Sequence, residues 1–234
     1  ANPLANNRPI MDISFIIESM PRLLPGLLLT INLSLVSLGV AAIIGLPLGI
    51  IHAEIKNKFI RLIIDFYVFL VRGTPILVQL YAAYFLLPMT GFKMSPFWIG
   101  IVALVFNSAG YQVEIARAAI LSINEGQREG GRALGLSKFQ TLQKIVLPQA
   151  LPRMLPALAN EASNLVKASS VLSVIAVFEL HKAANAIISQ SYKFLEMLAA
   201  QAVLYMCFVI MLTQLSRWLE KRYGAYTQKA WDNR

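Results

Sequence analysis

Long stretches without a charged residue constrain this chain more than any other feature of its sequence. The longest, between Arg22 and His52, holds 29 uncharged residues. Three others hold 20 each, and they run from Arg72 to Lys93, Lys93 to Glu114 and Glu196 to Arg217. About 20 consecutive apolar residues are enough for a helix to cross the hydrocarbon of a bilayer. The four stretches therefore predict four transmembrane helices.

A fifth apolar stretch, residues 152–176, is interrupted by Glu161 and Lys167. Charges inside a membrane helix are costly, so we expect these two to be functional or paired. Segment 58–71 is too short to cross before Arg72, and we expect it to lie at the membrane interface and to lead into the second span. The predicted fold class is therefore all-α, a polytopic membrane protein with five transmembrane helices.

The overall composition agrees with a membrane protein. The chain is 57% hydrophobic and only 14% charged, with a mean hydropathy of +0.60, which leaves too little polar surface for a soluble globule. A net charge of +9 would suggest nucleic acid in a soluble protein. Here the basic residues lie between apolar stretches, where lipid and topology explain them, so we expect membrane lipid and no nucleic acid as a partner.

The distribution of lysine and arginine predicts the orientation, because these residues are enriched on the cytoplasmic side. Thirteen of them follow the first, third and fifth spans: Lys56, Lys58, Arg61, Arg117, Arg128, Arg132, Lys138, Lys144, Arg217, Lys221, Arg222, Lys229 and Arg234. Five lie on the opposite side: Arg8, Arg22, Lys93, Lys182 and Lys193. This predicts an external N-terminus and a cytoplasmic C-terminus in a bacterial inner membrane. The mildly amphipathic outer link, residues 178–194, predicts a short helix on the outer surface.

The chain is expected to form one domain. The predicted division is an external segment 1–24, a permease domain 25–217 with a cytoplasmic loop at 118–150, and a cytoplasmic tail 218–234. Met11 is a candidate native start, with the residues before it a remnant of expression. The absence of an internal repeat in the sequence argues against a secondary transporter built from inverted repeats.

The loop after the third span has the pattern of a helix-turn-helix. Residues 125–134 predict one short helix, and Gly135 can adopt the left-handed conformation that ends it. Ser137 can cap a second helix, which we expect to end at Pro148. A chain needs no such polar, basic surface merely to span lipid, so the loop predicts a docking site for a soluble partner.

The spacing of residues in this loop resembles the EAA loop of ABC importer permeases: Glu129, Gly130, Gly131, Gly135, Ile145, Leu147 and Pro148. Other stretches resemble the polar amino acid branch of that family (histidine, arginine, lysine, glutamine or glutamate): Arg72-Gly73-Thr74-Pro75 with Gln79, YQVEIAR at 111–117, residues 123–127, and LPQA at 147–150. The resemblance runs from about Leu27 to the end. It implies a type I importer permease in which two ATPases dock on the loops of two permease subunits, identical or paralogous, and an external binding protein delivers the substrate.

Two departures from the family pattern stand out. Gly130 and Gly131 replace the usual alanines, and each costs about 1 kcal/mol of helix propensity. The first helix of the loop is therefore expected to be looser, or closer to its partner. Residues 167–171 read Lys-Ala-Ser-Ser-Val where many members have Lys-Asp-Thr-Ser-Leu, so no role of that aspartate is carried over.

Coupling to an external energy source is predicted, because the sequence has no G-x-x-x-x-G-K-[ST] phosphate loop. ATP and Mg²⁺ are expected on the partner ATPase, and no cofactor or metal on this chain. Glu129 is expected to meet basic or backbone donors of the ATPase, and Arg128 and Arg132 to meet its carboxylates. The full set of expected coupling residues is Glu125, Arg128, Glu129, Arg132, Gly135 and Pro148.

Polar residues within the spans predict the substrate site. Asn107, Tyr111 and Glu114 share one face of span three, and Asn164 and Lys167 share a face of span four beside Glu161. Both charge signs could meet a zwitterion. The resemblance likewise points to the span-three asparagine and the span-four glutamate. The expected substrate contacts are Asn107, Glu161, Lys167, Glu114 and Asn164. The alternative is structural: Glu161 or Glu114 neutralises Lys167 or Arg117 within the bundle.

Other functions have less support in the sequence. His52 and His181 are the only histidines, and no H-E-x-x-H or G-x-S-x-G motif occurs, so hydrolytic chemistry is not expected. A passive channel for polar solutes would explain polar seams, but it would not explain a helix-turn-helix with the spacing of an ATPase dock. This channel, or a secondary transporter, remains the alternative to an ATP-driven importer.

Overall fold

The computed structural model describes residues 11–232, and within them all regular structure is helical, which confirms the all-α prediction. The suggestion that residues 1–10 are a remnant lies outside the described residues. The helices are α1 Ile13–Glu54, α2 Lys58–Gly73, α3 Ile76–Met89, α4 Pro96–Leu121, α5 Glu125–Ala133, α6 Lys138–Thr141, α7 Leu147–Ala168, α8 Leu180–Ser191 and α9 Phe194–Asp232. A π turn, Leu142–Val146, precedes α7, and a 3₁₀ turn, Ser169–Ile175, follows it.

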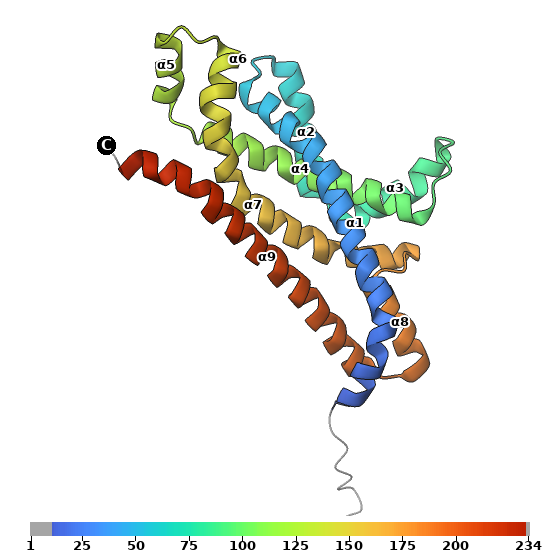
Figure 1. Cartoon of the computed structure of the whole chain (residues 1–234). Helices are drawn as coiled ribbons and strands as arrows, with labels where there is room; N and C mark the ends of the chain where they lie inside the picture. Colours follow the sequence, from blue (N-terminus) through green and yellow to red (C-terminus); the bar gives the residue numbers. More distant parts are fainter. Residues whose placement is uncertain (1–10, 233–234) are drawn as a thin grey trace, which may run out of the picture.

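Three helices are long and apolar enough to cross a membrane alone: α1, α4 and the Phe194–Arg222 part of α9. Two bent pairs pass the same test together. The α2–α3 pair is bent by 110°, and the segment Lys138–Ile175 is bent by 51° from α8. The predicted number of five spans is reached when each bent pair counts as one crossing. Figure 1 shows α1 and α9 as the two longest helices, with α5 and α6 at one end of the molecule and α8 at the other.

The helix at the second predicted span is shorter than the uncharged stretch of 20 residues that predicted it. α3 has 14 residues, about 21 Å at 1.5 Å per residue, which is short of a hydrocarbon thickness of about 30 Å. Pro75 has no backbone N–H, and Thr74 before it is extended, so the chain turns sharply between α2 and α3. At the other end, Gly91 adopts a φ of +90° in the turn that follows α3. Counting uncharged residues could not reveal either break.

Glycines bring α1 and α4 into backbone contact. A Cβ on Gly45 would lie 2.6 Å from the carbonyl oxygen of Ala109, and one on Gly49 would collide with the backbone of Val113. α1 also passes through Pro47 without ending. This is the close approach that small residues four apart permit between membrane helices. The middle of α1 therefore packs directly against the backbone of α4 at these glycines.

The turn between α5 and α6 follows the prediction at its start. Asn124 caps α5, Gly135 has a φ of +77°, and Ser137 forms a capping box with Gln140 at the start of α6. The predicted end at Pro148 is wrong, because Pro148 lies in the first turn of α7 and the chain stays helical from Lys138. Proline cannot donate a backbone hydrogen bond, and the wider π turn before it accommodates this. α6 is thus continuous with α7.

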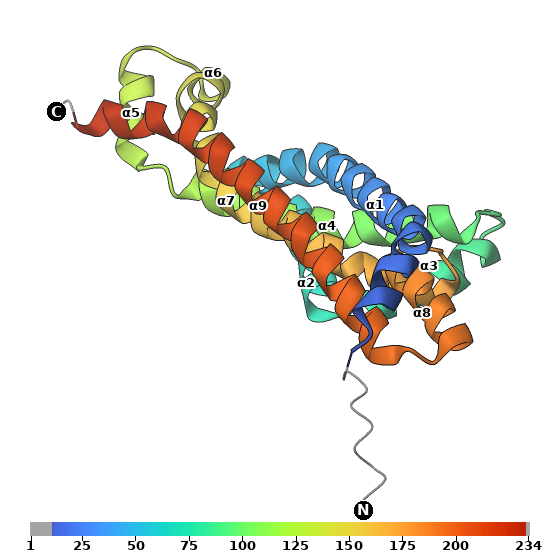
Figure 2. The ribbon, with the colours of Figure 1, turned by 60° about the horizontal axis from the view of Figure 1, so that its bottom comes forward.

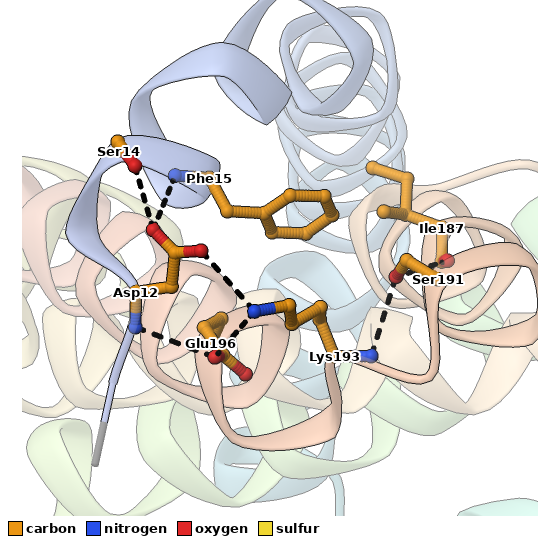
Figure 3. A network of polar contacts seen from close by, with 7 residues as sticks. All are labelled: Asp12, Ser14, Phe15, Ile187, Ser191, Lys193 and Glu196. Carbon is orange, nitrogen blue, oxygen red and sulfur yellow. Dashed lines mark hydrogen bonds and ion pairs between the residues drawn. The ribbon is translucent and has the colours of Figure 1, made fainter. Parts of the chain in front are cut away.

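The opposite end of the molecule is closed by a network around Asp12, shown in Figure 3. The Asp12 carboxylate caps α1, which begins at Ile13, well before the first uncharged stretch. Lys193 Nζ lies 3.1 Å from Asp12 Oδ2, and Asp12 N donates to Glu196 Oε1. Hydrogen bonds from Ser14, Phe15 and Lys193 lower the pKa of Asp12 to about 2. The start of α1 is thereby tied to the turn that joins α8 to α9. α8 is the short helix that was expected in the outer link.

Candidate functional site

A cavity of about 510 Å³ opens where the α2–α3 break meets α4 and α7, and we call it the polar cavity. Its lining combines charged, amide, hydroxyl and apolar groups. The lining residues are Arg72, Gly73, Thr74, Pro75, Ile76, Asn107, Tyr111, Glu161, Asn164, Leu165 and Ala168. A few polar groups on a largely preformed concave surface are typical of small-molecule sites. Three of the five expected substrate contacts lie here: Asn107, Glu161 and Asn164.

Gln79 builds the α2–α3 side of the polar cavity. It is only 7% exposed, and its Nε2 lies 2.9 Å from the Val71 carbonyl oxygen and 2.9 Å from Thr74 Oγ1. Its Oε1 accepts a hydrogen bond of 3.0 Å from Asn107 Nδ2 on α4. A single buried amide therefore holds the broken helix pair in shape and fixes the orientation of Asn107. This explains why a glutamine follows the Arg-Gly-Thr-Pro turn.

Glu161 supplies the acidic wall from α7. The side chain is 6% exposed, and Ser108 Oγ on α4 donates to Glu161 Oε1 at 2.7 Å. Gln112 Nε2 in turn donates to Ser108 Oγ at 3.2 Å. No basic side chain pairs with Glu161 among residues 11–222, so its structural neutralisation by Lys167 does not occur here. The carboxylate is oriented by a hydroxyl and still faces the cavity.

Lys167 and Glu114 do not line the polar cavity, so the cavity does not support the expectation of either as a substrate contact. Lys167 follows Glu161 by six residues, and at about 100° per residue this turns it well away from the face of Glu161. Its side chain is exposed. Glu114 Oε1 forms an ion pair with Arg117 Nη1 at 3.0 Å. This is the structural alternative, in which Glu114 neutralises Arg117 within the bundle.

Arg72 was not among the expected substrate contacts. The 110° bend between α2 and α3 brings it to the wall of the polar cavity. Within the described part of the chain no carboxylate forms a salt bridge with it. The neighbouring Pro75 was the available signal, because proline favours an extended residue before it and thus a turn. The cavity therefore carries a cationic wall at Arg72 and an acidic wall at Glu161.

The α5–α6 segment, residues 125–141, lies at the far end from α8 in both Figure 1 and Figure 2. Arg128 and Arg132, which were expected to meet carboxylates of the ATPase, pair here with acids of their own chain. Both meet Glu125, and Arg128 Nη1 also lies 2.7 Å from Glu54 Oε1. Glu129 and Pro148 are exposed. Leu134 and Phe139 are 80% and 70% exposed, so the segment presents apolar side chains outward.

The two loop glycines differ in their surroundings. A Cβ on Gly131 would lie 2.9 Å from Ile145 Cδ1 and 3.0 Å from Thr141 Cγ2, whereas a Cβ on Gly130 would meet nothing within 4 Å. Gly131 therefore lets α5 lie close against the π turn of its own chain. This close approach is internal to the chain, and closeness to a partner stays a prediction. Gly130 leaves open space on the outer face of α5.

Comparison with known proteins places this architecture in a family. Residues 45–225 match the family described as "Binding-protein-dependent transport system inner membrane component". The arginine transport system permease protein ArtQ of Bacillus subtilis (strain 168) is 37% identical over 216 residues, covering 91% of this chain and 97% of that protein. The glutamine transport system permease protein GlnP of Escherichia coli (strain K12) is 38% identical over 216 residues, covering 90% and 97%.

Solved structures agree with the sequence relatives. A chain from the crystal structure of an amino acid ABC transporter with histidines superposes with a TM-score of 0.84 at 31% identity, covering 91% of this chain and 99% of that chain. The inward-facing MetNI methionine ABC transporter gives a TM-score of 0.74 at 20% identity and covers 88% and 98%, a likeness of fold. The apolar helices and these matches identify a multi-pass inner membrane protein. The chain belongs to the binding-protein-dependent transport system inner membrane components, the ABC importer permease family that its EAA-like loop predicted.

Proposed function

We propose that this chain is the permease subunit of an ATP-driven importer of polar or charged L-amino acids. The observation that carries the proposal is the polar cavity, where Arg72 and Glu161 offer opposite charges on two walls. An α-carboxylate is recognised by a guanidinium, and an α-ammonium is recognised by a carboxylate. Relatives named for arginine and glutamine transport support a polar amino acid as the solute.

The groups around the charged pair fit this class of solute. Asn107, held by Gln79, keeps the second hydrogen atom of its amide for the solute, and Asn164 adds a second amide on α7. Tyr111 and Thr74 add hydroxyl groups. Amide and hydroxyl groups can satisfy either a neutral or a cationic polar side chain. Arg72 thus takes the role that the sequence reading gave to Lys167.

Energy for transport is proposed to come from two separate ATPase subunits that dock on the α5–α6 segment. Leu134 and Phe139 are large apolar side chains on an otherwise polar segment, and a docked protein would remove them from water. Glu129 is exposed on the same segment and can meet basic donors of the partner. ATP and Mg²⁺ would bind the ATPases, because this sequence has no phosphate loop.

The complete transporter is proposed to contain a second permease, identical or paralogous, and an external amino-acid-binding protein. The predicted excess of basic residues on one side supports an external N-terminus and a cytoplasmic α5–α6 segment. Movement of the ATPases on nucleotide binding would rock the spans between inward and outward openings. The domain division predicted from the sequence stays a proposal in this setting, with the permease domain at residues 25–217.

The test is uptake into proteoliposomes that contain the permease, its ATPases and the binding protein. Glu161→Gln should reduce uptake of the preferred amino acid by about tenfold or more, because a charge-assisted hydrogen bond to the solute is lost. Competition with unlabelled charged and polar amino acids should show a changed order of preference. Glu114→Gln is the matched control, since its partner is Arg117 and it lies outside the cavity. Equal uptake by the two variants would reject the polar cavity as the substrate site.

A further inference from the structure

The last turn of α1 is bonded to the α5–α6 segment through an ion pair. Arg128 Nη1 on α5 lies 2.7 Å from Glu54 Oε1, and the Arg128 side chain is 17% exposed against 31% for Glu54. Arg128 Nε also lies 3.7 Å from Glu125 Oε2. Fully exposed ion pairs contribute little, so the burial of Arg128 gives this pair its weight. The pair joins α5 to the C-terminal end of α1.

A second bond joins the same turn of α1 to α2. His52 is 2% exposed, and its Nε2 donates to Asp65 Oδ1 at 2.9 Å. The carboxylate can only accept, so the proton of a neutral ring lies on Nε2. Nδ1 is buried without a partner within the described residues. Burying Nδ1 without a partner costs folding free energy. We take the hydrogen bond from Nε2 to Asp65 as the contact that offsets this cost and fixes α2 against α1.

α2 carries this contact to the polar cavity. From Asp65 the helix runs without a break to Gly73, and Arg72 and Gly73 line the cavity. α2 is held against α4 on the way, because Val71 fills the space above Gly110 and Tyr67 OH donates to the Phe106 carbonyl oxygen at 2.7 Å. A rigid helix of this kind moves as a unit. Displacement at Asp65 therefore moves Arg72.

The acidic wall has its own connection to the α5–α6 segment. α6, the π turn and α7 form one continuous helical path, and Glu161 lies on α7. Because Gly131 has no side chain, α5 can pack closely against Thr141 and Ile145 of that path. The α5–α6 segment thus reaches Glu161 through α7. It reaches Arg72 through the end of α1 and through α2.

We infer that Glu54–Arg128 and His52–Asp65 are positioning contacts that couple the α5–α6 segment to the cationic wall of the polar cavity. The inference rests on the proposed function and deepens it, since it assigns a second transmission route to the same site. Both walls of the cavity would move together when the ATPases move, which would change the distance between the two charges that hold the amino acid. A chain of contacts becomes a coupling route only when a measured interaction energy supports it.

The first experiment is a charge swap across the ion pair in proteoliposomes with the ATPases and binding protein. Glu54→Arg and Arg128→Glu should each lower the uptake per ATP hydrolysed by about threefold to tenfold, and the double variant should restore it to within about threefold. ATP hydrolysis itself should fall much less, because the apolar docking residues are untouched. A parallel fall of hydrolysis and uptake, or no restoration in the double variant, would overturn the inference.

The second experiment tests the histidine contact with conservative variants. Asp65→Asn keeps an acceptor for His52 Nε2 and should keep uptake per ATP near wild type, whereas Asp65→Ala should lower it about threefold or more. Asp65 is itself half exposed, so neither variant leaves a cavity in the core. Equal ratios in the two variants would overturn this contact's role. If the wild-type assembly showed no ATP-driven uptake at all, the proposed function would fail, and this inference would fail with it.

Discussion

The polar cavity and the α5–α6 segment are both rich in polar groups, yet they use them in opposite ways. In the cavity, Gln79 and Ser108 are buried and orient Asn107 and Glu161. In the segment, the arginines are satisfied by acids of the same chain, while large apolar side chains face outward. A preorganised polar site suits a small charged solute, and an exposed apolar surface on a rigid base suits a protein partner.

Replacing Arg72, the cationic side chain of the polar cavity, should have the largest effect on uptake. Arg72→Gln should lower uptake by about tenfold to a hundredfold, because a charge-assisted hydrogen bond to the solute is worth about 1.5–3 kcal/mol. Lys167→Gln is the control, since Lys167 is exposed and does not line the cavity. Initial uptake rates over a range of substrate concentrations would measure both. A larger loss in the lysine variant would restore the sequence-based choice of Lys167.

Replacing the exposed apolar side chains of the α5–α6 segment should have the next largest effect, which is on binding of the ATPase. Leu134→Ser and Phe139→Ser should each weaken binding of the ATPase by about tenfold, as expected for apolar anchors in an interface. Their folding should be unchanged, because both side chains are exposed in the free subunit. The affinity of detergent-purified permease for the ATPase gives the readout. Unchanged affinity in both variants would remove the segment's apolar surface from the interface.

The two adjacent glycines of α5 provide a matched pair of smaller effects. Gly130→Ala should stabilise α5 by about 1 kcal/mol, because alanine is the better helix former and the site is open. Gly131→Val should destabilise the packing of α5 by about 1–3 kcal/mol, because its methyl groups meet Thr141 and Ile145. Hydrogen exchange of the α5 amides would report both changes. The same sign for both variants would contradict the geometry.

The smallest effect concerns the closed end of the molecule. The pKa of Asp12 is about 2 in the folded chain against a usual value of 3.8, so its contribution is fully present above pH 3.8 and is lost as the pH falls toward 2. The carboxylate is exposed, which keeps the effect small. The hydrogen-exchange rates of the Phe15 amide in the wild type and in Asp12→Asn should therefore approach each other as the pH falls from 3.8 toward 2. Curves that stay parallel from pH 5 to pH 2 would contradict the capping role.

Sequence reasoning found what local rules decide. The α5 helix, the left-handed Gly135 and the Ser137 cap follow from propensities and capping, and the structure has all three. The uncharged stretches located α1, α4 and most of α9. Asn107 and Glu161 were singled out because polar residues within apolar helices are costly and need a reason, and both line the polar cavity. These signals depend only on neighbours in the chain.

The differences from the sequence analysis concern the direction that the chain or a side chain takes. The 110° bend between α2 and α3 brings Arg72 to the wall of the polar cavity, and a count of charges along the sequence contains no such angle. Pro148 was expected to end a helix, but the π turn before it allows the helix to continue. Lys167 was grouped with Asn164, but helical rotation carries it past the wall that Glu161 forms. Each error concerns where a residue faces after the chain bends or turns.

The most direct test of the account is uptake in proteoliposomes whose contents are varied one component at a time. With permease, ATPases, binding protein, ATP and Mg²⁺ all present, we predict concentrative uptake of a polar amino acid, and no uptake when ATP or the ATPases are left out. Uptake down a gradient by the permease alone, unchanged on adding ATP and ATPases, would show a channel and contradict the account.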